Sequence, residues 1–201
     1  MTRRLRHIIL LTILTLGFKK IFSQRQFPEP ADLKVSSLKK NKVDTIILYH
    51  HYYNGGDNHF YKKRDANCRP TYVRIVFWVK NGQYFKQKFD HCKDYPKQKL
   101  NQSAFIKLSM DSLNKIKINE IEPVSYTHLD KDGKQLTTMC RVSHSEITKF
   151  TFFINKISFS KIIDHFDIET DKTNDGYDNE NYQINQTSIL KRLMDSVTKE
   201  L

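Results

Sequence analysis

Apolar and polar positions alternate along several stretches of the chain, and this period-two pattern predicts β-strands. The clearest case is the pair of runs 71–80 and 83–90, which are rich in β-branched and aromatic residues and flank Asn81-Gly82. Asn-Gly is the favoured two-residue hairpin turn, because both positions must take positive φ. The sequence therefore predicts an antiparallel hairpin here.

Other strand-like runs are less regular. They are expected at 43–53, 121–129, 134–143 and 147–154. Residues 158–166 fit a short helix or another strand equally well, because periodicity does not decide between the two. Since most of these runs are joined by short turns, we expect them to pair as an antiparallel sheet.

Two segments change to helical spacing. In 103–117 the apolar residues share one face and charged residues lie opposite. In 187–200 a second apolar stripe follows Thr187 and Ser188, either of which can cap a helix. The expected fold class is α+β: an antiparallel β-sheet with a helix at 103–117 and a C-terminal helix at 187–200 packed on it.

The expected domain organisation has three parts. Residues 1–23 are interpreted as a signal peptide, and the polar residues 24–42 as an extended lead-in over the surface. Residues 43–201 are expected to form a single α+β domain, which is an ordinary size for one domain. Within it, 164–185 is expected to be an exposed acidic loop, because its first 17 residues hold seven acidic side chains against one lysine.

The N-terminal segment has the layout of a secretory leader. Three arginines precede an apolar run at 8–18, which Lys19 and Lys20 end before it reaches the ~20 residues that a membrane span needs. Cleavage is expected after Ser23, which leaves no transmembrane span in the mature chain. An uncleaved membrane anchor and a cytosolic chain remain alternatives, but the expected location is secreted or periplasmic.

The charge is unevenly distributed. The formal net charge is +12, and residues 25–120 carry 19 basic and 9 acidic residues, whereas residues 121–201 carry 10 and 13. A basic half of this kind favours an anionic partner, such as an envelope or surface component. The alternative is an ordinary lysine-rich surface. Export makes nucleic acid an unlikely partner.

Three cysteines occur in a chain that is expected to fold in an oxidising compartment. One disulfide and one remaining thiol is then the simplest arrangement. Cys68 and Cys92 lie at the same end of the predicted hairpin, so they are the favoured pair; a pairing that uses Cys140, or three reduced thiols, are the alternatives. A catalytic Cys140 near His144 is a sharper hypothesis, but a small core cysteine is the simpler interpretation of Cys140.

The sequence predicts no cofactor and no strong metal site. His50 and His51 are adjacent on a predicted strand and therefore point to opposite faces, so they cannot share one metal. A weak zinc set combines four side chains that could meet at one end of the sheet. Its members are Asp57, His59, His91 and Cys92.

A weak calcium candidate lies in the acidic loop. Asp171 and Asp175 match positions 1 and 5 of a calcium-binding loop, but Tyr182 stands at position 12, where a bidentate glutamate belongs. A solvated loop without calcium is the simpler interpretation.

An aromatic and basic strip around residues 54–59 is the main candidate for ligand contact. Rings beside cations bind carbohydrate and anionic surfaces, although most such rings serve to pack the core. The candidate contact residues are Tyr52, Tyr53, Asp57, His59, Tyr61, Lys62, Lys63 and Arg64.

These patterns favour a non-catalytic exported module, with a binding or envelope-associated role. The first alternative is a small exported hydrolase, which requires one of the histidines 50, 51, 59 or 91 to meet a carboxylate. The second is a secreted protein-interaction factor, which requires an exposed apolar patch.

Overall fold

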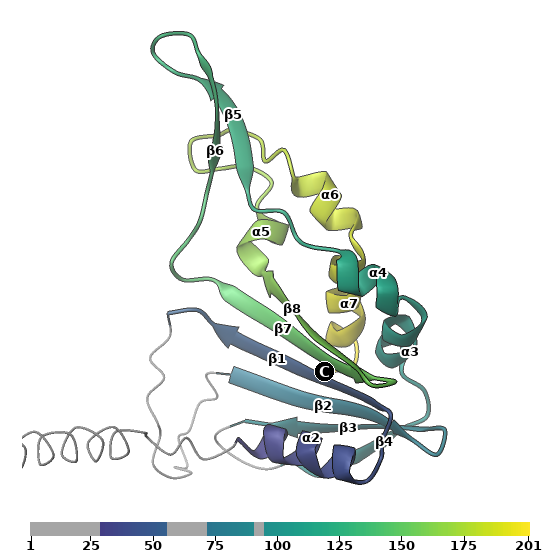
Figure 1. Cartoon of the computed structure of the whole chain (residues 1–201). Coiled ribbons are helices and arrows are strands. Elements are labelled where there is room, and N and C mark those ends of the chain that lie inside the picture. Colours follow the sequence, from purple (N-terminus) through teal and green to yellow (C-terminus); the bar gives the residue numbers. More distant parts are fainter. Residues whose placement is uncertain (1–28, 56–71, 91–94) are drawn as a thin grey trace, which may run out of the picture.

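Six antiparallel strands form the central sheet of this protein, in the order β4-β3-β2-β1-β7-β8, and helices lie on each of its two faces (Figure 1). The computed structural model describes residues 29–55, 72–90 and 95–201. The predicted α+β class, with its antiparallel sheet and a helix near the C-terminus, is confirmed. The strands are β1 (Thr45–Tyr53), β2 (Tyr72–Lys80), β3 (Gln83–Phe89), β4 (Gln98–Leu100), β7 (Glu146–Ile154) and β8 (Ile157–Asp164).

The predicted hairpin is confirmed as β2 and β3. Lys80 pairs with Gln83, and the turn residues Asn81 and Gly82 have φ of 51° and 69°. The ambiguous segment at 158–166 forms strand β8 and then, directly after Asp164, a short helix α5 (His165–Glu169).

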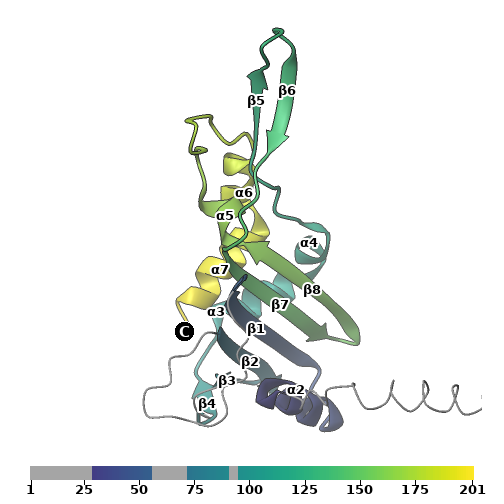
Figure 2. The same ribbon diagram turned by 90° about the vertical axis from the view of Figure 1, so that its left-hand side faces the viewer.

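A second, two-stranded sheet projects from the body of the protein (Figure 2). It consists of β5 (Ser125–Leu129) and β6 (Gln135–Met139), so the strands expected at 121–129 and 134–143 are present in shorter form. The two strands pair only with each other among the residues that the structure describes.

The larger part of the core lies between the sheet and α3 (Ala104–Asp111), α4 (Leu113–Ile118) and α7 (Ile189–Thr198) (Figure 1). The single helix expected at 103–117 is divided at Ser112, which has φ −114° and ψ 15°. One turn earlier, Ser109 donates a hydrogen bond to the Phe105 carbonyl at 2.8 Å, a pattern that bends helices. Ser188 caps α7 by accepting a hydrogen bond from the Lys191 N–H at 3.1 Å.

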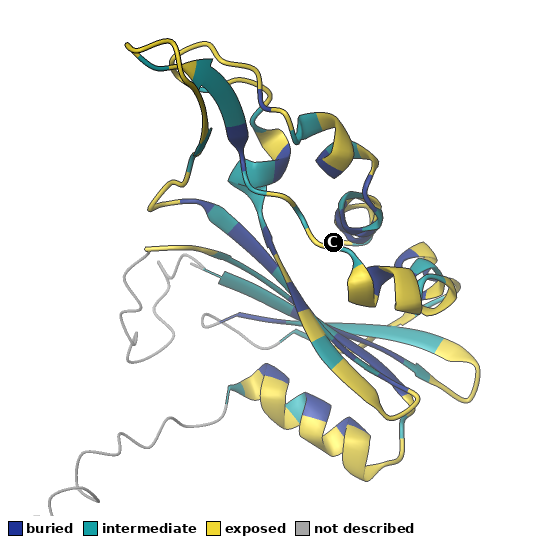
Figure 3. Ribbon diagram, turned by 45° about the horizontal axis from the view of Figure 1, so that its top comes forward, coloured by how far each residue is buried: buried dark blue, intermediate teal, exposed yellow. Residues whose placement is uncertain are grey.

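The prediction that residues 24–42 form an extended lead-in is wrong for most of that range. Pro30–Lys40 is a helix, α2, and its buried side faces the sheet on the surface opposite α7 (Figure 3). Proline is well suited to the first helical position, since its missing N–H has no partner there. Ala31, Val35 and Leu38 are buried against Ile46, Val76, Trp78 and Phe89.

The acidic loop is shorter than the expected 164–185. Helix α5 occupies its beginning and helix α6 (Tyr182–Thr187) its end, so the stretch between the two helices is residues 170–181. Helix α5 is anchored by Ile168, which is completely buried. The stretch after it is held by Asn179, whose side-chain amide donates to the Thr170 carbonyl at 2.8 Å and whose N–H donates to the Asp171 carbonyl at 2.8 Å.

The expected signal peptide, residues 1–23, lies outside the described residues. Among the helices that the structure does describe, none is long and apolar enough to cross a membrane.

Candidate functional site

Polar side chains gather where strand β1 ends beside the start of strand β7. The antiparallel register places His51 opposite Thr148, and Tyr53 opposite Glu146. Side chains of paired residues lie on the same face of a sheet. Further along this face Tyr49 and Phe150 belong to the main core, so the polar group lies at the edge of that core.

Helix α5 adds a second histidine to this group. Strand β8 ends at Asp164, whose carboxylate accepts hydrogen bonds from the Phe166 N–H at 3.0 Å and from the Ser145 hydroxyl at 2.9 Å. These two bonds fix the start of α5 against β7. As a result His165, the first residue of α5, lies with its ring centroid 5.4 Å from that of His51.

The side chains of His51, Glu146 and His165 form what we term the His–Glu–His cluster. Glu146 Oε2 lies 3.6 Å from His51 Nε2 and 3.6 Å from His165 Nδ1. One potential ligand atom from each residue lies within 4.8 Å of the others. Glu169, one turn further along α5, places Oε1 at 3.5 Å from His165 Nδ1 and is largely exposed.

Two hydroxyl groups orient the cluster through hydrogen bonds to its outer atoms. The buried Thr148 Oγ1 lies 3.3 Å from His51 Nδ1 and 2.9 Å from His165 Nε2. The Tyr53 hydroxyl donates a hydrogen bond to Glu146 Oε1 at 2.6 Å, which leaves Oε2 to face the two rings. Each of the three side chains is therefore held through an atom that does not point into the cluster.

Burial lowers the pKa of both histidines near the end of β1. The pKa of His51 is lowered, first by burial and then by the charge of His165, while Glu146 opposes the shift. His50 points to the other face, where its ring lies 4.6 Å from that of Tyr52. Burial, followed by the charges of Arg74 and Lys149, lowers the pKa of His50 to about 3. The expectation that His50 and His51 lie on opposite faces agrees with these contacts.

The opposite face of the sheet carries a basic surface beside α2. The ring centroids of Trp78 and Phe85 are stacked 5.4 Å apart, with Lys34 Nζ 4.8 Å from the Trp78 centroid and Lys97 Nζ 5.0 Å from the Phe85 centroid. Lys99 pairs with Phe85 in the register of β3 and β4 and therefore lies on the same face. We refer to Lys34, Lys97 and Lys99 as the lysine face.

The lysine face has few acidic neighbours. Strands β3 and β4 contain no acidic residue. Asp32, on α2, accepts a hydrogen bond from Arg74 at 2.9 Å and so is already paired. The pKa of Lys34 is lowered, first by burial and then by the charge of Lys97.

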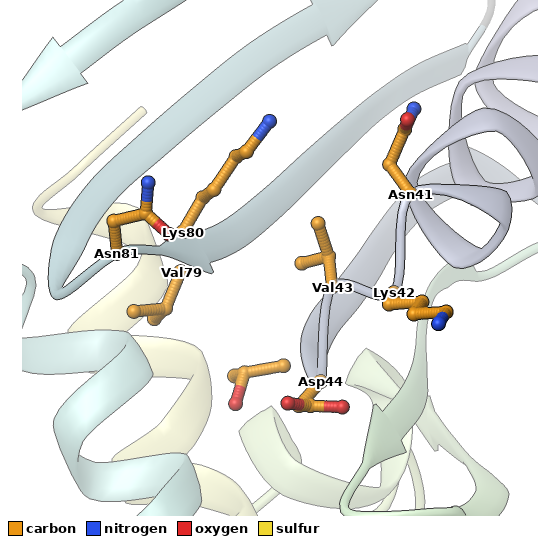
Figure 4. Close-up of a pocket in the computed structure, with 8 residues that line it drawn as sticks. Asn41, Lys42, Val43, Asp44, Val79, Lys80 and Asn81 are labelled. Atoms are coloured by element: carbon orange, nitrogen blue, oxygen red, sulfur yellow. The ribbon is translucent and has the colours of Figure 1, made fainter.

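A shallow hollow of about 260 Å³ lies at the other end of β1 from the His–Glu–His cluster, between the start of β1 and the turn after β2 (Figure 4). Its lining includes Asp44, Lys42 and Lys80. Figure 4 shows the two lysine side chains running away from the Asp44 carboxylate. The hollow therefore does not bring opposite charges together around a ligand.

Most of the residues expected to contact a ligand lie outside the described residues. Tyr52 and Tyr53 are described and, as neighbours on β1, point to opposite faces, so they do not form one strip. Tyr49, which flanks them, is buried in the core. The candidates that lie outside the described residues are Asp57, His59, Tyr61, Lys62, Lys63, Arg64, Cys68, His91 and Cys92.

Cys140 is a free, half-buried thiol just after the end of β6. The strand ends at Met139, so the regular spacing that would place Cys140 and His144 on one face does not continue. His144 is exposed, and its Nδ1 lies 2.8 Å from the Ser143 hydroxyl. The favoured disulfide, Cys68 with Cys92, falls outside the described residues.

The two calcium candidates lie in a tight turn. The Thr173 N–H donates to the Tyr177 carbonyl at 2.8 Å, and Lys172 forms an ion pair with Asp178 at 3.1 Å. Asp171 and Asp175 are both exposed. Within the described part of the chain, they do not belong to a group of three His, Cys, Asp or Glu side chains at ligand spacing.

The fold and these sites define an α+β protein with a polar His–Glu–His cluster on one face of its sheet and a basic surface on the other. Comparison with known proteins gave no match of significance, whether to a family model, to a curated protein or to a solved structure.

Proposed function

We propose that this chain is an exported, non-catalytic binding module that attaches to an anionic envelope or surface component through its lysine face. The observation that carries the proposal is that Lys34 and Lys97 lie over two adjacent, stacked rings, those of Trp78 and Phe85. Two ammonium groups that repel each other, with no acidic residue in the neighbouring strands, are stabilised when an anion binds between them.

The surrounding chain supports this assignment. The half of the sequence that forms α2 and the strands β1 to β4 is the basic half, with 19 basic against 9 acidic residues in 25–120. Lys97 and Lys99 are both exposed, so their charges are available to a partner. A polymer or surface with repeated phosphate, sulfate or carboxylate groups has the complementary charge.

Charge reversal on the lysine face should weaken this binding. For the double variant Lys97→Glu and Lys99→Glu, we expect retention on dextran sulfate and on vesicles with anionic lipid to fall at least about tenfold, since each lysine near an anionic surface contributes ~1 kcal/mol. The measurement is bound protein against NaCl concentration, and the two matrices separate a polymer from a lipid as the partner.

The matched control is Lys131→Glu with Lys134→Glu, which makes the same change in net charge at two exposed positions of the β5–β6 ribbon. We expect this control to retain most of the binding. Equal losses in both variants, or no salt-dependent retention of the unmodified protein, would contradict the proposal.

Export has its own test. If residues 1–23 direct the chain out of the cell, protein recovered from the periplasm or medium of the expressing cell should begin at Gln24. Mass spectrometry of the intact protein and of its N-terminal peptide measures this directly. Recovery of protein beginning at Met1 or Thr2 from the soluble cytosolic fraction would refute export while leaving the lysine face untested by that result.

One observation favours the alternative of a small exported hydrolase. That hypothesis requires a histidine on the first strand to meet a carboxylate, and His51 Nε2 lies 3.6 Å from Glu146 Oε2. Hydrogen-bond distances in resting enzymes are often longer than in complexes with substrate. The hollow beside Asp44 is not part of this arrangement, because it lies at the other end of β1.

A further inference from the structure

The His–Glu–His cluster has a composition that is unusual for an ordinary ion pair. Its three facing atoms are two imidazole nitrogens and one carboxylate oxygen, and each of these atoms offers an electron pair when its group is unprotonated. A carboxylate that faces two such lone pairs is repelled by them. A proton on a ring nitrogen, or a metal cation between the three groups, turns that repulsion into attraction.

The spacing fits a metal ion. Bonds of ~2.0–2.2 Å from a zinc ion in tetrahedral geometry place ligand atoms about 3.3–3.6 Å apart. Glu146 Oε2 is 3.6 Å from both His51 Nε2 and His165 Nδ1, which is close to this range before any adjustment. These separations exceed those of good hydrogen bonds, which are ~2.7–3.2 Å. Both separations from Glu146 are therefore too wide for direct hydrogen bonds and close to the spacing that an ion requires, and the three ligand atoms all lie within 4.8 Å of one another.

The outer hydrogen bonds are compatible with the tautomers that bind metal. A threonine hydroxyl has two lone pairs and one proton. If His51 carries its proton on Nδ1 and His165 on Nε2, both rings donate to Thr148 Oγ1, at 3.3 Å and 2.9 Å. The Thr148 proton is then free to bond Tyr49, with which that hydroxyl also interacts. This assignment leaves His51 Nε2 and His165 Nδ1 unprotonated and directed at Glu146.

Hydrogen bonds of this type also orient the ligands in metal sites of proteins generally. Histidine ligands typically donate their second ring N–H to an oxygen, and carboxylate ligands are themselves hydrogen bonded. Thr148 supplies the oxygen for both rings, and the Tyr53 hydroxyl supplies the bond to Glu146 Oε1. All three side chains of the cluster are thus oriented before an ion arrives.

The donor atoms indicate the class of ion. Two of the three are imidazole nitrogens, which suit zinc, copper, iron and nickel, whereas calcium and magnesium prefer oxygen ligands throughout. We infer that His51, Glu146 and His165 form a binding site for a divalent transition-metal ion, with Zn²⁺ as its representative. Three protein ligands leave a coordination position for solvent or for the nearby Glu169 carboxylate.

The site is separate from the lysine face, which lies on the other side of the sheet, so each can fail without the other. The test uses the full mature chain, which is first freed of metal ions by a chelator and dialysis. Zn²⁺ is then the only metal added. We expect isothermal titration calorimetry to show that the unmodified protein binds Zn²⁺. In Glu146→Gln the Kd for Zn²⁺ should rise at least ~100-fold, because one of three ligands is removed and even the loss of an outer hydrogen bond weakens metal binding about 10- to 100-fold. Titration with Co²⁺ should give visible absorption bands from a site of four or five ligands, and these bands should disappear in the same variant.

The control is His144→Ala, which removes an exposed histidine nearby that is not part of the cluster. This variant should bind Zn²⁺ as the unmodified protein does. Glu146→Gln is nearly isosteric and can still accept the Tyr53 hydrogen bond, so a fold unchanged by circular dichroism is expected. His165→Ala provides a second removal of a ligand, from helix α5 rather than from the sheet.

The outer bonds can be tested in the same titration. Thr148→Val keeps the volume of a buried side chain but removes the oxygen that orients both rings, and Tyr53→Phe removes the donor to Glu146. A positioning role predicts a rise in Kd of about 10- to 100-fold for Thr148→Val and recovery in Thr148→Ser. The proposal is overturned if the unmodified protein binds no Zn²⁺, or if Zn²⁺ binding is undiminished in Glu146→Gln and His165→Ala.

Discussion

Replacement of Asn185 by alanine is expected to lower the free energy of unfolding by about 2–4 kcal/mol. The Asn185 side chain is completely buried in α6. Its amide accepts a hydrogen bond from the Glu122 N–H at 2.9 Å and donates to the Glu122 and Asp167 carbonyls at 2.8 Å and 2.9 Å. Alanine leaves all three of these backbone groups without that partner.

The effect should be large because one completely buried side chain joins three segments. The bonds to Glu122 tie α6 to the chain entering β5, and the bond to Asp167 ties it to α5. Equilibrium unfolding in urea measures the loss. Ile184→Ala, which changes an exposed neighbour in the same helix, is the control and should stay within about 0.5 kcal/mol of the unmodified protein. A loss below 1 kcal/mol in Asn185→Ala would show that water replaces the amide.

Phe105→Ala is expected to cost about 3–5 kcal/mol of stability, the largest effect that we anticipate from a single substitution. The Phe105 ring is completely buried on α3, and its centroid lies 4.8 Å from that of Phe77 and 5.7 Å from that of Phe150. Its removal leaves a cavity between α3 and strands β2 and β7. Rigid strands on one side of the cavity limit how far the surroundings can close it.

The control for Phe105→Ala is Met110→Ala, on the same helix, where 44% of the residue is exposed. Urea unfolding followed by circular dichroism and by tryptophan fluorescence should give coincident transitions for both variants. If Phe105→Ala shifted the midpoint no further than Met110→Ala, the packing of α3 on the sheet described above would be wrong.

Local signals were enough to predict much of the fold. The β2–β3 hairpin follows from Asn81-Gly82, because the turn and its flanking strands are adjacent in sequence. Helix α7 follows from its single apolar face and its capping serine. Strand β4, only three residues of mixed polarity, gave no such signal. Helix α2 was missed because its apolar stripe is narrow and becomes meaningful only against the sheet face that it covers.

The His–Glu–His cluster could not be predicted in the same way. His51 and Thr148 are 97 positions apart in sequence and meet only because β1 pairs with β7. The expectation that adjacent histidines on a strand point to opposite faces agrees with the position of His50, whose ring lies beside that of Tyr52 and away from the cluster. The sequence of β1 does not indicate which strand pairs with it, nor that a helix follows β8. A correct β1–β7 register would have been the signal that identified Glu146.

The place of β1 in the sheet has a consequence for how the molecule assembles. β2 with β3, and β7 with β8, are hairpins between neighbours in sequence, whereas β1 joins these two hairpins through a contact between distant parts of the chain. Contacts of long sequence separation form late and slowly, because the loop between them must first be closed. Formation of the cluster at the end of β1 would therefore report the step at which β1 pairs with the β7–β8 hairpin.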